Sequence, residues 1–140
     1  MVHRFIRKLF IVICLVVLST SAFAELVVIV HPSNNSELNA KKVQRIFLGK
    51  EKKFSNGSPV MPFNQTTNAL RGAFDSDVLG RSSTQVSAYW SKLVFTGKGI
   101  PPKELADDAA VIAAVAANAG AIGYVDSSAV TGDVKTISIK

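Results

Sequence analysis

Residues 64–71 combine the side chains of this chain that are best suited to binding a small anion. An apolar run with Val60, Met61 and Phe63 ends in a polar turn, and the turn leads into a helical pattern. The start of a helix presents free backbone N–H groups and the positive end of the helix dipole to an anion. The candidate anion ligands are Asn64, Thr66, Thr67, Asn68 and Arg71.

Two structural alternatives remain open for this segment. It could be an ordinary capped helix, because Thr66, Thr67 and Asn68 are all suitable N-cap residues. Arg71 precedes Asp75 by four residues, so an ion pair within the helix competes with a ligand for the guanidinium. A guanidinium that escapes this pairing could bind an oxyanion through two parallel hydrogen bonds.

Catalytic and metal-binding chemistry find little support in the sequence. His31 is the one histidine beyond the first 24 residues, and no Gly-x-Ser-x-Gly motif accompanies it. The acidic pairs Asp75/Asp77 and Asp107/Asp108 lie at predicted turns and helix starts, where carboxylates stabilise the helix dipole. No group of His, Asp and Glu has the spacing of metal ligands. We therefore expect a protein that is not an enzyme and has no cofactor.

The first 24 residues predict export. Three basic residues precede the apolar run Leu9–Leu18, and small residues follow it. This pattern is typical of a secretory signal cleaved between Ala24 and Glu25, and the apolar run is shorter than the ~20 residues of a membrane span. The expected organisation is a signal peptide over 1–24 and one exported domain over 25–140.

The predicted cleavage changes the composition of the chain. Of 16 basic residues three lie in the signal, and the other 13 with 10 acidic residues give a net charge of +3. This charge is compatible with an anionic ligand or an acidic partner, but it does not indicate nucleic-acid binding. Cys14 is the single cysteine and lies in the signal, so we expect no disulfide and no thiolate chemistry.

Strand and helix patterns alternate over residues 25–140. The predicted strands are Leu26–Val30, the run around Val60–Phe63, Ala121–Val125 and Val134–Ile139, and the predicted helices begin at Asn39, at 66–68, at 82–84 and at Asp107 or Asp108. This order predicts an α/β domain with a mixed or mostly parallel sheet. Ligands of such sheets bind beyond the C-terminal ends of the strands, where residues 63–71 are expected.

Two other groups of residues have open roles. Lys50, Lys52 and Lys53 could bind an acidic partner or could simply be solvated in a loop. Tyr89 and Trp90 could form an aromatic platform for a ligand. Their helical spacing with neighbouring apolar residues is also typical of core positions.

Several motifs occur in an order that resembles a known family. They are Gln44-Arg45-Ile46-Phe47-Leu48-Gly49-Lys50, Pro59-Val60-Met61-Pro62, Phe74, Tyr89-Trp90, Gly97-Lys98-Gly99 and Gly120-Ala121-Ile122-Gly123-Tyr124-Val125. The chain resembles the phosphate-binding proteins of phosphate ABC transporters, within the type II periplasmic binding proteins, and in particular their short single-domain members. The resemblance implies a single α/β lobe with a mixed sheet flanked by helices. It also implies phosphate or a related oxyanion as ligand, and a transporter permease or another envelope protein as partner.

The chain departs from this family in two respects. Full-length members have two lobes that close around the anion, whereas residues 25–140 supply about one, so a homodimer or a partner would have to complete the cleft. The family's arginine after the strand falls at Asn64, and its Ser-Gly-Thr run falls near 68–70. Two interpretations follow: a solute-binding protein in which Arg71 and its neighbours act as ligands, or an envelope interaction module that has kept the fold and lost the ligand.

Overall fold

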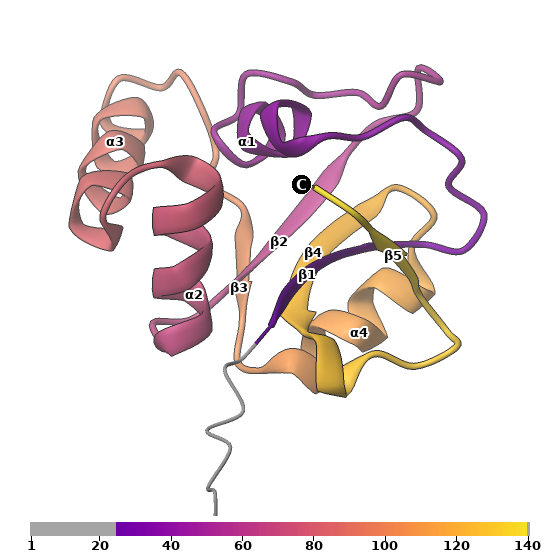
Figure 1. Ribbon diagram of the computed structural model, residues 1–140. Helices are drawn as coiled ribbons and strands as arrows, with labels where there is room; N and C mark the ends of the chain where they lie inside the picture. The colour runs from indigo at the N-terminus through magenta and orange to yellow at the C-terminus, as the bar shows by residue number, and fades with distance from the viewer. Residues whose placement is uncertain (1–24, 140) are drawn as a thin grey trace, which may run out of the picture.

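The β-branched run Leu26–Val30 forms the first strand of the computed structural model, which describes residues 25–139 (Figure 1). The predicted signal peptide over 1–24 lies outside the described residues. The elements in chain order are β1 Leu26–Val30, α1 Ala40–Phe47, β2 Met61–Gln65, α2 Ala69–Phe74, the π-helical turn η3 Asp75–Leu79, α3 Ser83–Phe95, β3 Lys103–Leu105, α4 Asp108–Ala117, β4 Ala121–Asp126, the 3-10 turn η4 Ser127–Ala129 and β5 Lys135–Ile137.

The five strands form one mixed sheet in the order β3-β2-β4-β1-β5. β2 runs parallel to β3 and β4, whereas β1 is antiparallel to both β4 and β5. In the register of the sheet, Phe63 lies opposite Lys103 and Val28 lies opposite Tyr124. The predicted mixed sheet is confirmed.

Strand β3 was not predicted, because Lys103–Leu105 has three residues and no β-branched side chain. Its pairing with β2 is a tertiary contact that local pattern does not reveal.

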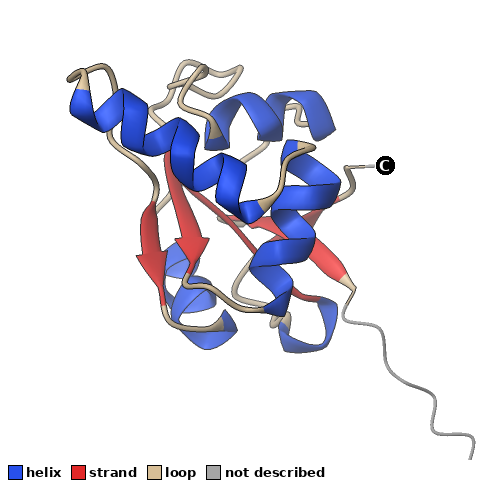
Figure 2. Ribbon diagram, turned by 90° about the vertical axis from the view of Figure 1, so that its left-hand side faces the viewer, coloured by secondary structure: helices blue, strands red, loops and turns tan. Residues whose placement is uncertain are grey.

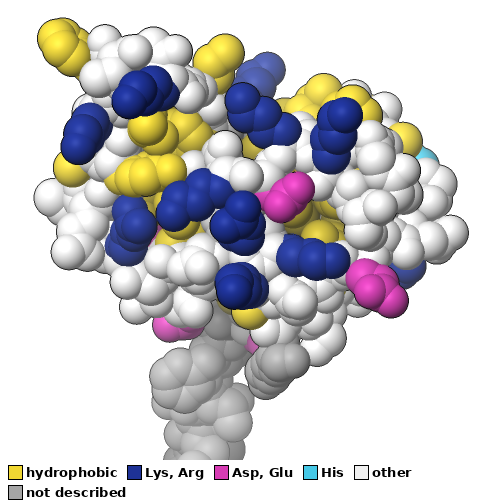
Figure 3. All heavy atoms as spheres, turned by 90° about the horizontal axis from the view of Figure 1, so that it is seen from above, with side chains coloured by type: hydrophobic (Ala, Val, Ile, Leu, Met, Phe, Trp, Pro, Cys, Tyr) yellow, Lys and Arg dark blue, Asp and Glu magenta, His cyan; other side chains and the backbone are white. Residues whose placement is uncertain are grey.

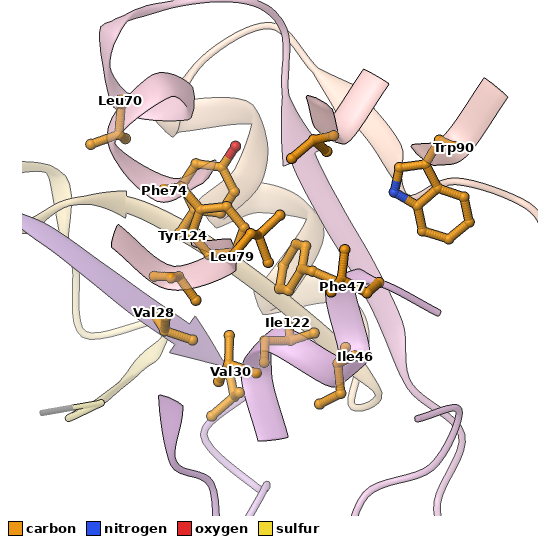
Figure 4. Close-up of a cluster of buried hydrophobic side chains, with 14 of the residues drawn as sticks. Val28, Val30, Ile46, Phe47, Leu70, Phe74, Leu79, Trp90, Ile122 and Tyr124 are labelled. Carbon is orange, nitrogen blue, oxygen red and sulfur yellow. The ribbon is translucent and has the colours of Figure 1, made fainter. Parts of the chain in front are cut away.

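Alternate side chains of the strands enter two separate cores, as the two-residue period of a strand requires. On one face, Val28, Val30, Ile122 and Tyr124 pack against α1, α2, η3 and α3 (Figure 4). On the other face, Ile29, Phe63, Ala121 and Val125 pack against Val111 and Val115 of α4. The domain therefore has three layers, with α1, α2 and α3 on one face of the sheet and α4 on the other (Figure 1).

The helices begin at the residues that the sequence indicates. Asn39, Asn68, Ser82 and Asp107 each accept a backbone N–H on their side-chain oxygen as the N-cap. Ser82 and Gln85 form a reciprocal capping box. These signals are local, so sequence alone suffices to find them.

Gly123 allows close contact between β4 and α4. A methyl group on Gly123 would lie 2.5 Å from Cγ1 of Val111 and 3.7 Å from the carbonyl oxygen of Phe63. No side chain fits in this space unless α4 moves away from the sheet. Below the sheet, α4 thus packs directly on the backbone of β4.

Candidate anion-binding site

β2 and α2 bring Asn64 and Arg71 together in a groove beside the edge strand β3. The groove has a volume of about 450 Å³, and Figure 2 shows α3 lying across this edge of the sheet. Its polar lining comes from Asn64 of β2, Arg71 of α2, Glu104 of β3, and Ser87 and Ser91 of α3, and its apolar wall comes from Trp90, Val94, Phe95, Pro101 and Pro102. The groove is thus lined by side chains from four elements.

Asn64 presents its amide nitrogen to this groove. The residue is only 3% exposed, and its Oδ1 accepts the hydroxyl of Tyr124 and the backbone N–H of Gln65, the latter at 2.9 Å. Because both acceptor positions are occupied, the NH2 group is the part of Asn64 that remains for a ligand. Asn64 can therefore donate hydrogen bonds to an anion.

Arg71 lies at the centre of a charged cluster. Its Nη1 donates to the carbonyl of Gln65 at 2.9 Å and to the carboxylate of Glu104. Its Nε lies 3.6 Å from Oδ2 of Asp75, which confirms the i,i+4 ion pair that the sequence left open. Two carboxylates therefore surround one guanidinium, and their negative charge opposes a second anion.

The two carboxylates differ in how firmly they are held. The side chain of Glu104 is 51% exposed, whereas that of Asp75 is fully buried. Asp75 also accepts the hydroxyl of Ser83 at 2.8 Å. Glu104 can therefore exchange Arg71 for water more easily than Asp75 can.

Arg71 keeps its positive charge in this environment. Burial lowers the pKa of the guanidinium, but the hydrogen bond to Glu104 and the charges of Asp75 and Glu104 outweigh burial, and the net pKa is raised. Arg71 is therefore cationic at every pH at which the protein is folded.

Thr66, Thr67 and Asn68 lie on an exposed turn outside the lining of the groove. The N–H of Thr66 donates to Leu105 at 2.9 Å and so joins the end of β2 to β3. Asn68 accepts the N–H of Arg71 at 2.8 Å and donates through Nδ2 to the side chain of Gln65 at 2.9 Å. Of the five predicted residues, the structure brings Asn64 and Arg71 into the groove and leaves three on the turn beside it.

Ser87 and Ser91 are groove residues that the sequence analysis missed. They are four residues apart on α3, so their hydroxyls lie on one face of the helix, one turn apart. This spacing is the one sequence signal that could have identified them. Glu104 was missed because it lies on β3, which was itself not predicted.

Tyr124 links Asn64 to the core and gives the site a titratable reporter. Burial raises the pKa of Tyr124, although the N–H of Gln65 and the charge of Arg71 oppose the shift. The folded-state pKa thus lies above the unfolded value of about 10. The protonated phenol therefore contributes stability that is fully present below pH ~10 and is lost as the pH rises above it.

This linkage predicts alkaline unfolding coupled to ionisation of Tyr124. In a Tyr89→Phe variant Tyr124 is the one remaining tyrosine. We expect the ultraviolet absorbance of phenolate to appear together with the loss of circular dichroism, at a pH above about 10. Ionisation near pH 10 in a protein that is still folded would contradict the burial of this hydroxyl.

Metal ligation finds no support among residues 25–139, where no three His, Cys, Asp or Glu side chains are grouped around a common point. In the same range, every helix is too short or too polar to cross a bilayer.

The comparisons with known proteins concern the fold. The chain matches no protein-family model, and no curated protein matches its sequence. Three solved structures are similar: a candidate phosphate ABC transporter substrate-binding protein with bound phosphate from Clostridium perfringens (TM-score 0.64, 18% identity), an ABC-type phosphate transport receptor from Vibrio cholerae (0.63, 16%) and a candidate phosphate binding protein from Planctomyces limnophilus (0.58, 16%). The match covers 81%, 81% and 82% of this chain but 44%, 45% and 41% of theirs.

These similarities confirm the predicted fold class. The chain has a mixed-sheet α/β fold that is similar to part of each of these neighbours, and it spans less than half the length of each. The neighbours are named as binding or transport proteins.

Proposed function

We propose that this protein is a secreted, non-enzymatic solute-binding-like protein of the periplasm that binds phosphate or a related small oxyanion. Its partner would be an ABC transporter permease or a sensor in the envelope. The observation that carries this proposal is the convergence of Asn64 and Arg71, with Ser87 and Ser91, on one groove. The phosphate bound in the Clostridium perfringens structure, which has a similar fold, supports an oxyanion as ligand.

Donors from two walls of the groove would hold the anion. Arg71 would supply a charged fork, the amide of Asn64 would donate from the sheet, and the two serine hydroxyls would donate from α3. Thr66, Thr67 and Asn68 lie on the turn beside the groove, so in this proposal they do not contact the anion directly.

Release of Glu104 from Arg71 is the step that binding would require. The pair is half-buried, since the side chain of Glu104 is 51% exposed and that of Arg71 is 12% exposed. Its loss therefore costs more than the ~0–1 kcal/mol of a fully exposed pair, and a bidentate arginine–phosphate contact would have to replace it. Asp75 would stay in place and keep the guanidinium oriented. Glu104 thereby acts as an internal competitor that lowers affinity without blocking the site.

Thermal unfolding of the purified protein with phosphate, sulfate or chloride at matched ionic strength tests the proposal. Phosphate at ~100 times its dissociation constant should stabilise the protein by about 2.7 kcal/mol and raise Tm by several degrees. Glu104→Gln should bind phosphate on the order of tenfold more tightly, because one charged competitor is gone. Glu51→Gln, which removes the same charge near Arg45 on the surface, should leave the affinity unchanged.

The alternative function is an interaction module of the envelope without a solute. The two carboxylates around Arg71 favour it, because they already neutralise the one guanidinium of the groove. Equal stabilisation by phosphate, sulfate and chloride, both in the protein and in Glu104→Gln, would reject the solute-binding proposal and favour this alternative.

A further inference from the structure

A second, larger groove lies on the face of the sheet that α1, α2 and α3 cover. It runs between the end of α1, helix α3 and the loop that follows α3. Its volume is about 900 Å³. The apolar lining includes Ile46, Leu48, Val60, Pro62, Tyr89, Trp90, Leu93, Val94, Ile100 and Pro102, and the charged lining consists of Lys50, Glu51, Lys52 and Lys98. We name it the lysine-rimmed groove.

Trp90 forms the floor of this groove in a rigid arrangement. A methyl group on Gly49 would lie 2.8 Å from Cη2 of Trp90, and one on Gly99 would lie 3.2 Å from its Cζ3. Both loops thus press against the indole ring. The indole Nε1–H is buried and has no hydrogen-bond partner among the described residues. This packing fixes the shape of the groove before a partner segment binds.

The charge around the groove is mainly positive. Lys50, Lys52 and Lys98 are three cations on its rim, and Arg45 lies 3.7 Å from the one carboxylate, that of Glu51. Figure 3, which looks down on this side of the molecule, shows apolar surface bordered by lysine and arginine side chains. A binding partner must therefore combine apolar groups with negative charge.

Two apolar side chains at the groove are exposed to solvent. Ile100 is 90% exposed and Val94 is 51% exposed, and both lie on the wall of the groove. Exposed apolar surface with a polar rim is typical of sites that bind another protein.

We propose that the lysine-rimmed groove docks a segment of a partner protein in which leucine-like or aromatic side chains are flanked by aspartate or glutamate. Apolar side chains of the segment bury Ile100, Val94 and the edge of Trp90, and its carboxylates meet Lys50, Lys52 and Lys98. The groove adjoins the anion groove and shares Trp90, Val94 and Pro102 with it, whereas Asn64 and Arg71 line the anion groove and not this one.

Peptide selection tests this inference without knowledge of the partner. A displayed library of random short peptides is selected on the purified protein, and the enriched sequences are synthesised. We expect acidic residues beside Leu, Ile or Phe, and binding that weakens as salt rises. Trp90 is the one tryptophan of the chain, so its fluorescence should change on binding.

Matched variants locate the binding. Lys50→Glu/Lys98→Glu should weaken the peptides by about tenfold or more, whereas Lys41→Glu/Lys103→Glu, with the same change of net charge away from the groove, should not. Ile100→Ser should also weaken them.

Phe95→Ser is the control for Ile100→Ser. Phe95 is 92% exposed and lines the other groove, so this change should have no effect on the peptides.

Three results would overturn the inference. Charge at the groove would have no role if the selected peptides lacked acidic residues, or if their affinity fell equally in Lys50→Glu/Lys98→Glu and in Lys41→Glu/Lys103→Glu. A concentration-dependent dimer that is abolished by Lys50→Glu/Lys98→Glu would make a second copy the occupant. Vesicles of phosphatidylglycerol that bind the protein with the same dependence on Lys50 and Lys98 would make the occupant a lipid surface.

Discussion

Arg71→Met should lower the free energy of unfolding by about 3–5 kcal/mol, because it leaves the buried carboxylate of Asp75 without its cation. The side chain of Asp75 has no exposed surface and that of Arg71 is 12% exposed. After the substitution Asp75 retains the hydroxyl of Ser83 as a donor, but its Oδ1 already lacks a partner among the described residues. Urea unfolding with linear extrapolation measures the loss.

A surface ion pair provides the control for this prediction. Arg45 and Glu51 lie 3.7 Å apart with both side chains 44% exposed, so Arg45→Met should change stability by at most about 1 kcal/mol. Arg71→Met/Asp75→Asn should recover most of the loss, because the unpaired buried charge is gone. If Arg71→Met is no more destabilising than Arg45→Met, the buried pair is not a structural element.

The buried pair also bears on the anion groove. An arginine that is free in solution must be ordered when a ligand binds, and that ordering weakens binding. Asp75 and the carbonyl of Gln65 already fix the guanidinium at the groove. The carboxylate of Asp75 also offsets the positive charge of Arg71. The arrangement therefore orients a ligand well but attracts an anion less strongly.

The sequence predicted those parts of the fold that local chemistry determines. The four N-caps and the β-branched strand β1 depend on residues that are near each other in the chain. Strand β3 forms by pairing with β2, which is distant in the sequence. Its three residues are too few to show an alternating pattern. The π-helical turn η3 was also unpredicted, since it differs from an α-helix only in its hydrogen bonds.

The candidate site was predicted in part for the same reason. Asn64 and Arg71 were identified because a strand end and a helix start follow one another in the sequence. Ser87, Ser91 and Glu104 enter the groove through tertiary packing of α3 and β3. The sequence indicated Asp75 as an ion-pair partner of Arg71, but it could not indicate the second partner, Glu104, which is 33 positions away.

Packing around Trp90 explains two of the motifs on which the family resemblance rests. The segments 44–50 and 97–99 each contribute a glycine that contacts the indole ring. These glycines therefore report on the packing of α3 against two loops. They indicate the fold and the lysine-rimmed groove, and they carry no information about phosphate.

Phe74→Ala should destabilise the protein by about 3–5 kcal/mol, the range for a large aromatic residue removed from a core. Phe74 is fully buried. It stacks on Tyr124 with ring centroids 3.9 Å apart. Its ring and that of Phe47 are arranged edge to face with centroids 4.7 Å apart (Figure 4). Its loss leaves a cavity and also removes the aromatic contacts, which add about 0.5–1.5 kcal/mol.

The effect of Phe74→Ala should extend to the anion groove, because Tyr124 holds Asn64 through its hydroxyl. Phosphate-dependent stabilisation should therefore fall in Phe74→Ala and be largely retained in Phe74→Leu, which fills more of the space. Phe95→Ala serves as the exposed counterpart and should change stability by less than about 0.5 kcal/mol. Equal losses in Phe74→Ala and Phe95→Ala, measured by urea unfolding, would contradict the central position of Phe74 between helix α2 and the sheet.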